Sequence, residues 1–236
     1  MFTTRRITTM GGDKFRDEFS LAFDGTDDYV QLGTPFNHTN ITIASWIKVT
    51  DDGDYKTIFS NRKNGTTKGI LLYVNGSEEI VFKVENVNTT GVAITAGRWY
   101  HIVATYNGIN QKVYVDGVLM ETETRTETDL DTDTNAMIGG DSLPASGSQY
   151  FFNGNISEVV IYNTTLTAQQ IKVIYNSGEI FNYLDHGYLR LHLKGWYRMG
   201  DGLENHSGTT IYDMSDNSNN GTMTNMAADD FQGDTP

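Results

Sequence analysis

Short runs of apolar residues, separated by polar turns, follow one another along most of the chain. In residues 41–49 the odd positions are mostly Ile or Val, and the even positions include Thr42, Trp46 and Lys48. Turn-forming pairs such as Asn75-Gly76 and Asp116-Gly117 join neighbouring runs. Strands at such short intervals, without alternating helices, predict an all-β sandwich of two antiparallel sheets.

One short helix interrupts this pattern. Thr167 and Gln170 have the spacing of a capping box, in which each side chain satisfies a free backbone N–H of the first turn. Ile171 and Ile174 then lie on one face, and Asn176-Ser177-Gly178 supplies a stop. We therefore expect a helix that docks its apolar stripe on the sandwich.

Four motifs between Phe19 and Gly178 resemble the laminin-G-like, concanavalin-A-like lectin family. They are Leu21-Ala-Phe-Asp-Gly-Thr-Asp-Asp-Tyr-Val, Ile41-Thr-Ile-Ala-Ser-Trp-Ile-Lys, Trp99-Tyr-His-Ile-Val-Ala-Thr-Tyr with Val113-Tyr-Val-Asp-Gly, and Phe152-Asn-Gly-Asn-Ile-Ser-Glu-Val-Val-Ile-Tyr with its helix. Their order along the chain resembles that of the family. The resemblance implies a jelly-roll sandwich, with the first motif as its opening hairpin.

A fifth motif stands at an unexpected place in the chain. Gly195-Trp-Tyr-Arg-Met-Gly-Asp201 and residues 211–222 resemble the strand pair that usually opens this domain, yet here they come last. A circularly permuted sandwich and a truncated second repeat both explain this order. We favour permutation, because few residues remain for a repeat. The expected organisation is an N-terminal arm at 1–16 and one sandwich at 17–236, with 188–236 supplying the relocated strand pair.

The N-terminal arm differs in charge from the rest of the chain. Arg5, Arg6, Lys14 and Arg16 stand against one acidic residue, which gives the arm a net charge of +3, whereas the whole chain carries −13. Such an arm is either a frayed terminus or a docking segment that folds onto a neighbouring subunit.

The acidic balance and the composition narrow the possible partners. A net charge of −13 repels phosphate backbones, so we expect no nucleic-acid partner. No apolar run is long enough to cross a bilayer, and none has the length of a signal-peptide core. The chain has no cysteine, so disulfides offer no argument for an oxidising compartment. Synthesis in a cytoplasm without membrane insertion is the expectation.

The residues needed for catalysis do not come together in the sequence. Glycosidases related to this fold need two carboxylates at a fixed separation, but Glu158 stands alone on its predicted strand, next to Ser157. The five histidines are scattered and no zinc motif occurs. We therefore expect a protein that is not an enzyme.

Ca²⁺ is the one cofactor for which the sequence offers ligands, since hard cations prefer clustered oxygens. Asp24, Asp27 and Asp28 share one predicted turn, and Asp213 lies with Asp216 and Asn219 in another. The candidate metal ligands are Asp24, Asp28 and Asp213. Hydrogen bonding of Asp and Asn to their own turns explains the same residues without a metal. In the resembling family an Asp precedes the glutamate of the closing strand and helps to bind the ion, whereas this chain has Ser157 there.

Two further segments have unusual side chains. In residues 121–133 every charged side chain falls at an odd position, which predicts a solvated edge strand or, alternatively, a cation-bridged subunit contact. Tyr150, Phe151 and Phe152 are candidates for stacking on a sugar ring, although we favour a place in the core or in a hairpin for them.

These features lead to two expectations for function. The first is a structural or adhesive virion protein of a bacteriophage, in a capsid decoration, fibre or tail. It would contact other virion proteins or copies of itself and present a surface to host-cell glycans. The basic arm, the acidic body and the absence of cysteine motivate this expectation. The alternative is a carbohydrate-binding module of a bacterial surface or secreted protein, located extracellularly.

Overall fold

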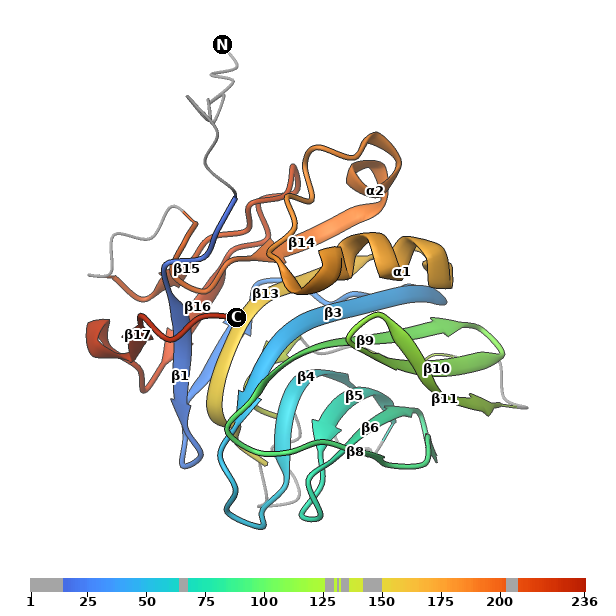
Figure 1. The fold of residues 1–236 in the computed structure, drawn as a ribbon, viewed down its shortest axis with the longest axis horizontal. Helices are drawn as coiled ribbons and strands as arrows, with labels where there is room; N and C mark the ends of the chain where they lie inside the picture. Colours follow the sequence, from blue (N-terminus) through green and yellow to red (C-terminus); the bar gives the residue numbers. More distant parts are fainter. Residues whose placement is uncertain are drawn as a thin grey trace.

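The computed structural model describes residues 15–63, 68–125, 130, 132, 136–141, 150–202 and 208–236. Within these residues two antiparallel sheets, of eight and nine strands, pack face to face (Figure 1). Their inward apolar side chains form one continuous core. The predicted all-β, jelly-roll sandwich is confirmed.

The first sheet has the order β11-β10-β9-β3-β13-β1-β17, and β14 pairs with another part of β13. Its strands are β1 (Ser20–Asp24), β3 (Asn40–Val49), β9 (Trp99–Asn107), β10 (Asn110–Val115), β11 (Val118–Thr124), β13 (Asn153–Tyr162), β14 (Leu193–Tyr197) and β17 (Phe231–Gln232).

The second sheet has the order β15-β16-β2-β12-β4-β5-β6-β7, and β8 also pairs with β6. Its strands are β2 (Tyr29–Leu32), β4 (Lys56–Arg62), β5 (Gly69–Val74), β6 (Glu79–Val84), β7 (Val87–Asn88), β8 (Val92–Ala93), β12 (Met137–Ile138), β15 (Thr210–Ile211) and β16 (Gly221–Thr224).

The middle strands of the first sheet are buried on both faces. Ile41, Ile43 and Ile47 of β3 point into the core between the sheets, as their alternation predicts. Ala44 belongs to a second apolar cluster on the outer face, together with Val103 of β9. Helices α1 (Ala168–Tyr175) and α2 (Gly187–His192) cover this outer face. Helix α1 lies across β3 in Figure 1.

Helix α1 begins and ends where the sequence predicts. Thr167 and Gln170 form a capping box, and Asn176 ends the helix in the left-handed conformation. Ile171 and Ile174 are its buried side chains. Two 3₁₀ turns, η1 (Asn176–Gly178) and η2 (Ala228–Asp230), and helix α2 were not predicted. None of the helices in the described ranges is long and apolar enough to cross a membrane.

Two of the predicted hairpin turns are present, whereas the predicted opening hairpin does not form. Asn75-Gly76 joins β5 to β6, and Asp116-Gly117 joins β10 to β11 with φ of 49° and 76°. The expected opening hairpin is wrong, because β1 pairs with β13 and β17 whereas β2 pairs with β12 and β16. The turn at 25–28 therefore carries the chain from one sheet to the other.

The acidic stretch at 121–133 begins in β11, which forms the end of the first sheet among the described residues. The predicted edge strand is confirmed for its described part. Arg125 departs from the prediction of a solvated side chain, because it is buried and its Nη1 donates to the Tyr106 hydroxyl at 2.6 Å. Residues 126–129, 131 and 133 lie outside the described residues.

The last part of the chain adds strands to both sheets. Strand β14 pairs with β13, with Val159 opposite Tyr197. Strand β16 pairs with β2, with Met223 opposite Val30, and β17 pairs with β1. Residues after 188 thus supply neighbours to three strands of the sandwich. Circular permutation as the origin of this order stays a prediction.

Deletion of residues 188–236 is expected to abolish cooperative folding. It removes the partners of β1, β2 and β13 together with the buried Trp196 and Tyr197. Urea unfolding followed by near-ultraviolet circular dichroism should show no cooperative transition. A matched deletion of residues 1–14 is the control and should keep the transition. A folded 1–187 fragment would contradict the assignment.

Candidate functional site

The three consecutive aromatic residues before β13 have three different environments. Phe152 is fully buried, and its ring meets Phe23 edge to face at 5.9 Å. Phe151 is half-buried and stacks on Tyr29 at 6.3 Å. Tyr150 is 38% exposed and contacts Tyr55 at 5.0 Å between ring centres. For Phe152 a role in sugar stacking is wrong, because its face is occupied by the core.

Tyr55, Tyr73 and Tyr150 form a cluster that we call the tyrosine platform. The rings of Tyr55 and Tyr73 stack at 5.8 Å with an angle of 21° between their planes. Tyr55 precedes β4 and is 45% exposed, whereas Tyr73 on β5 is nearly buried. The Thr57 backbone N–H donates to the Tyr150 carbonyl at 2.9 Å, which fixes the loop against β4. Two rings of the platform, Tyr55 and Tyr150, are therefore partly exposed to solvent, and Tyr55 stacks on Tyr73.

The register of β4, β5 and β6 continues the outer face beyond the platform. Leu71, Tyr73 and Val81 form a small apolar cluster on that face. Lys83 lies opposite Leu71, and Arg62 makes a buried ion pair with Asp141 at 2.9 Å. Partial burial, and then the nearby Arg62 charge, lower the pKa of Lys83. Next to the platform, the outer face therefore carries one half-buried cation, Lys83, whereas the Arg62–Asp141 pair is buried.

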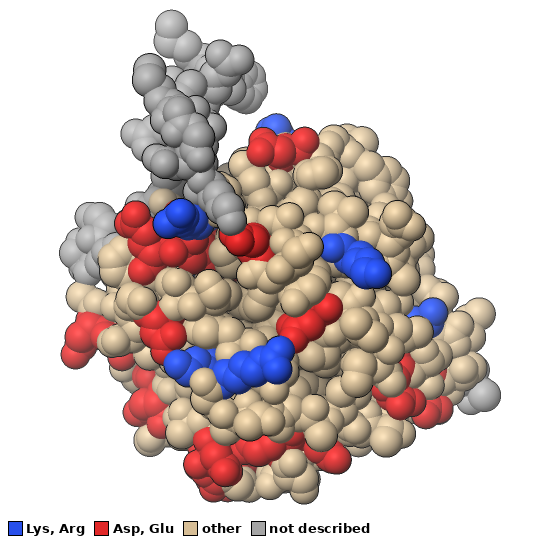
Figure 2. Space-filling view, viewed as in Figure 1, with Lys and Arg blue, Asp and Glu red and all other residues tan. Residues whose placement is uncertain are grey.

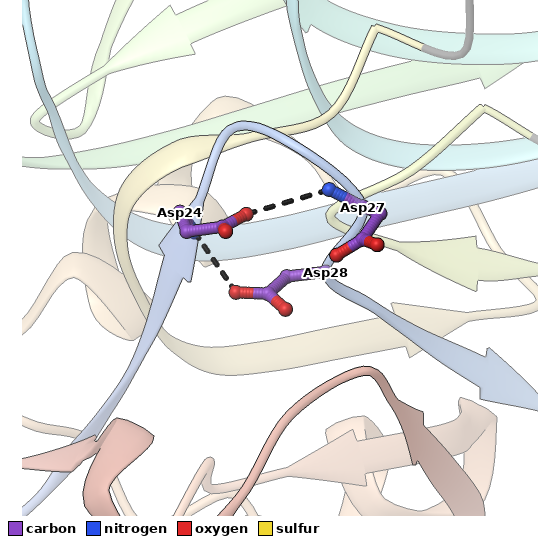
Figure 3. A group of neighbouring side chains, drawn as sticks. All are labelled: Asp24, Asp27 and Asp28. Carbon is purple, nitrogen blue, oxygen red and sulfur yellow. Dashed lines mark hydrogen bonds between the residues drawn. The ribbon is translucent and has the colours of Figure 1, made fainter.

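Asp24, Asp27 and Asp28 come together in the turn between β1 and β2 (Figure 3). One carboxylate oxygen of each lies within 4.8 Å of the others. The Asp24 Oδ1 accepts from the Thr26 N–H at 2.7 Å, and Asp28 Oδ2 accepts from the Asp24 N–H at 3.0 Å. The turn therefore shows the hydrogen bonding of an Asx turn as well as clustered oxygens. Whether it binds Ca²⁺ stays a prediction.

Burial raises the pKa of Asp28 to about 6, and the neighbouring carboxylates of Asp24, Asp230 and Asp27 add to this effect, against the Asp24 hydrogen bond. A carboxyl with a raised pKa is costly to ionise in the folded state. At neutral pH the turn consequently holds negative charges that repel one another.

The structure places Asp213 in a different site. Its Oδ1 accepts from the backbone N–H groups of Trp196 and Ser215, and its Oδ2 from that of Asn219, each at 2.9 Å. Asp216 instead pairs with Arg190 at 3.0 Å. Backbone donors thus reach both oxygens of Asp213, and Asp213 does not belong to the carboxylate cluster of the β1–β2 turn in the described residues. Its role as a metal ligand stays a prediction.

The end of the N-terminal arm is anchored on the sandwich. Arg5, Arg6 and Lys14 lie outside the described residues. Arg16 is exposed, and its backbone carbonyl accepts from Arg198 Nη2 at 2.8 Å. Phe15 lies beneath the Arg198 guanidinium, 4.4 Å from its centre. The docking role of the arm beyond this anchor stays a prediction.

Sequence reasoning missed a buried charge network around Arg198. The guanidinium pairs with Asp17 and with Glu158, each at 2.8 Å. Ser157 Oγ donates to Asp17, and Trp196 Nε1 donates to Glu158. Burial and the Asp17 charge raise the pKa of Glu158 well above its usual value. The single Arg198 cation neutralises only one of the two buried carboxylates. The remaining negative charge is therefore costly, and the pKa of Glu158 rises. No local pattern signals this network, because Arg198 lies directly after β14 and its two partners are distant in sequence.

A hollow of about 400 Å³ lies between η1 and α2, apart from the platform. Its lining includes Glu179, Asn182, Asp185 and the stacked rings of Phe181 and His186, 4.7 Å apart. Phe181 is buried in the outer apolar cluster. The hollow therefore offers polar groups together with apolar ones from Phe15, Ile180 and Phe181.

Comparisons with known proteins agree with this fold. Residues 24–172 match the family described as the concanavalin A-like lectin/glucanases superfamily (Laminin_G_3). A mouse protein, Sushi, von Willebrand factor type A, EGF and pentraxin domain-containing protein 1, is 29% identical over 179 residues. That match covers 67% of this chain and 5% of the mouse protein, so the chain spans a small part of that relative.

Two solved structures have a fold similar to this one. A Bacteroides ovatus protein described as a candidate carbohydrate-binding protein has a TM-score of 0.68 at 21% identity, over 89% of this chain and 59% of that one. The heptameric SAP-like pentraxin of Limulus polyphemus has a TM-score of 0.56 at 17% identity, over 67% and 82%. At these identities the likeness shows the fold.

Replacement of Asp28 by Asn is expected to change the pH dependence of stability. Because its folded pKa of about 6 exceeds the usual 3.8, the folded state binds more protons than the unfolded state between these values. Stability therefore falls as pH rises through this window. Asn keeps an oxygen for the Asp24 N–H and cannot ionise, so it should add about 1–3 kcal/mol at pH 7. Urea unfolding at pH 4 to 7 measures this, with the exposed Asp51→Asn as control. If the free energy of unfolding changed with pH equally in Asp28→Asn and in the wild type, the raised pKa of Asp28 would be refuted.

The calcium prediction has a separate test on the same variant. Millimolar CaCl₂, compared with a chelator, should raise the thermal midpoint of the wild type, because the cation relieves repulsion in the turn. The Asp28→Asn variant should show a smaller rise. No shift in the wild type would remove Ca²⁺ from the account.

Proposed function

The chain belongs to the concanavalin A-like lectin/glucanases superfamily, and on that premise we propose that it is a non-enzymatic glycan-binding protein. The tyrosine platform is the proposed binding surface. The observation that carries the proposal is the exposure of Tyr55 and Tyr150 on a stack that is supported by Tyr73. The carbohydrate-binding description of the Bacteroides ovatus protein supports the same class of ligand.

Sugar rings suit this surface for a physical reason. One face of a pyranose presents C–H groups that pack on an aromatic ring, while its hydroxyls point to the side. On the outer face beyond the rings, the half-buried Lys83 offers a donor for those hydroxyls. The hollow beside α2 is a weaker candidate, because Phe181 in its wall is buried.

Charge narrows the glycan class. The chain carries −13, and Figure 2 shows acidic side chains spread over the displayed face with fewer basic ones between them. Such a surface repels polyanionic chains. We therefore propose neutral polysaccharides or oligosaccharides as ligands, in preference to sulfated or polyuronic ones.

The buried carboxylate pair supports the non-enzymatic part of the proposal. Asp17 and Glu158 have side chains that are 0% and 1% exposed, and both are ion-paired with Arg198. A glycosidase pair must flank a bond of a bound substrate. These two carboxylates are instead held in the interior by a guanidinium.

Removal of the exposed rings is expected to weaken glycan binding. Tyr55→Ala and Tyr150→Ala should each reduce affinity about fivefold, because an aromatic contact contributes about 1 kcal/mol. Tyr188→Ala is the matched control, since Tyr188 is 54% exposed on α2. A glycan array identifies the ligand, and calorimetry on its strongest neutral hit measures the affinity. The thermal midpoints of the three variants should stay close to that of the wild type.

Two results would overturn the proposal. One is an array without signal for the wild type, with and without Ca²⁺. The other is an equal loss of affinity in Tyr188→Ala and in the platform variants. If the strongest hits on the array were polyanionic glycans, glycan binding would stand, but the assignment of neutral ligands would be wrong.

A narrower role on a virus particle stays a prediction from the sequence. It rests on the basic arm and on the absence of cysteine. The three proteins compared above are not described as virion components. Mass spectrometry of purified particles tests it directly, and particles without this chain would exclude the role. The extracellular location of a carbohydrate-binding module is the alternative proposal.

A further inference from the structure

We propose that the outer edge of β11 is a docking site for residues 2–9 of a second copy of this chain, which add to the first sheet as a further strand. This inference concerns assembly and does not depend on glycan binding.

The edge of β11 has the properties of a surface that another strand covers. Among the described residues β11 pairs only with β10, so one side of its backbone has no strand neighbour. Three consecutive apolar residues of β11 are exposed: Val118 (56%), Leu119 (45%) and Met120 (50%). Edge strands of monomeric proteins usually avoid such a run, because it promotes pairing with another chain.

The charge of β11 indicates the chemistry of its partner. Glu121 and Glu123 lie at its half-exposed positions, and the strand itself contains no basic residue. Figure 2 shows acidic side chains at the side of the molecule where β10 and β11 lie. Pairing of β11 with a second β11 would bring four carboxylates into one short ribbon, which is unfavourable. A basic strand fits better.

Residues 2–9, Phe-Thr-Thr-Arg-Arg-Ile-Thr-Thr, have the composition that such a partner requires. Six of the eight residues are Thr, Ile or Phe, which favour strands, and the other two are Arg5 and Arg6. The segment contains no acidic residue, although the whole chain carries −13. Its composition thus complements β11 in both β propensity and charge.

Distance favours a second copy over the chain's own arm. The arm joins the fold at Phe15, beside Trp196 of β14. Five strand spacings separate β14 from β11, which is about 24 Å at roughly 4.8 Å each. The chain from Thr9 to Phe15 reaches at most about 20 Å when fully extended. Helix α1 also covers the face between these two edges, so a direct path is blocked (Figure 1).

Association of the full chain tests the docking site first. Sedimentation equilibrium should show concentration-dependent self-association of the wild type that weakens with added salt. Arg5→Glu with Arg6→Glu should raise the dissociation constant about tenfold or more, because like charges would then face each other. Adding Glu121→Lys and Glu123→Lys to that variant should restore association. Met120→Lys should weaken it, whereas the control Leu191→Lys, at a 76% exposed position on α2, should not.

Cysteine cross-linking then identifies the occupant, because the chain has no cysteine of its own. A Thr8→Cys protein mixed with a Thr122→Cys protein should form a disulfide-linked heterodimer. Mixing with Thr90→Cys, at an exposed threonine in the loop after β7, should give much less.

A monomeric wild type would overturn the proposal. So would self-association that persists unchanged after reversal of Arg5 and Arg6, since it would indicate β11 self-pairing or another interface. Cross-linking that occurs only within one chain carrying both Thr8→Cys and Thr122→Cys would place the arm on its own edge and also contradict it.

Discussion

The ion pairs of Arg198 are the interaction that holds the N-terminal segment to the sandwich. The guanidinium joins Asp17 of the N-terminal segment to Glu158 of β13, and it extends from the turn that follows β14. Glu158 has φ of 51° where the pairing of β13 with β3 shifts register between Ser157 and Val160. This bulge turns an otherwise regular strand so that its carboxylate meets the arginine. Three segments distant in sequence are thereby held at one buried point.

The same anchoring leaves other parts of the sandwich available for binding. Strands β4 and β5 form a fully buried support in the second sheet, and the tyrosine platform rests on their outer face. The platform needs no movement to expose Tyr55 and Tyr150. Because Tyr55 and Tyr150 already contact each other, less side-chain freedom is lost when a sugar binds. Strand β11 lies at one edge of the other sheet, and among the described residues no strand covers its outer side.

Local chemistry predicted local structure well. The capping box of α1 and the Asp116-Gly117 turn are set by residues a few positions apart, so the sequence displays them directly. The β1–β2 connection was misjudged, because a turn does not encode which sheet receives the next strand. Tyr150, Phe151 and Phe152 are alike in sequence, and only their contacts with distant rings separate them. The Arg198–Glu158 pair joins residues 40 positions apart, beyond any local pattern.

The stability of charge-removal variants tests the role of Arg198 most directly. Arg198→Met leaves two buried carboxylates without their cation, so it should cost about 3–5 kcal/mol of unfolding free energy in urea. The combination of Arg198→Met with Asp17→Asn and Glu158→Gln removes every charge and should recover most of that loss. A cost of less than about 1 kcal/mol for Arg198→Met alone would contradict the account. So would a triple variant that is no more stable than Arg198→Met.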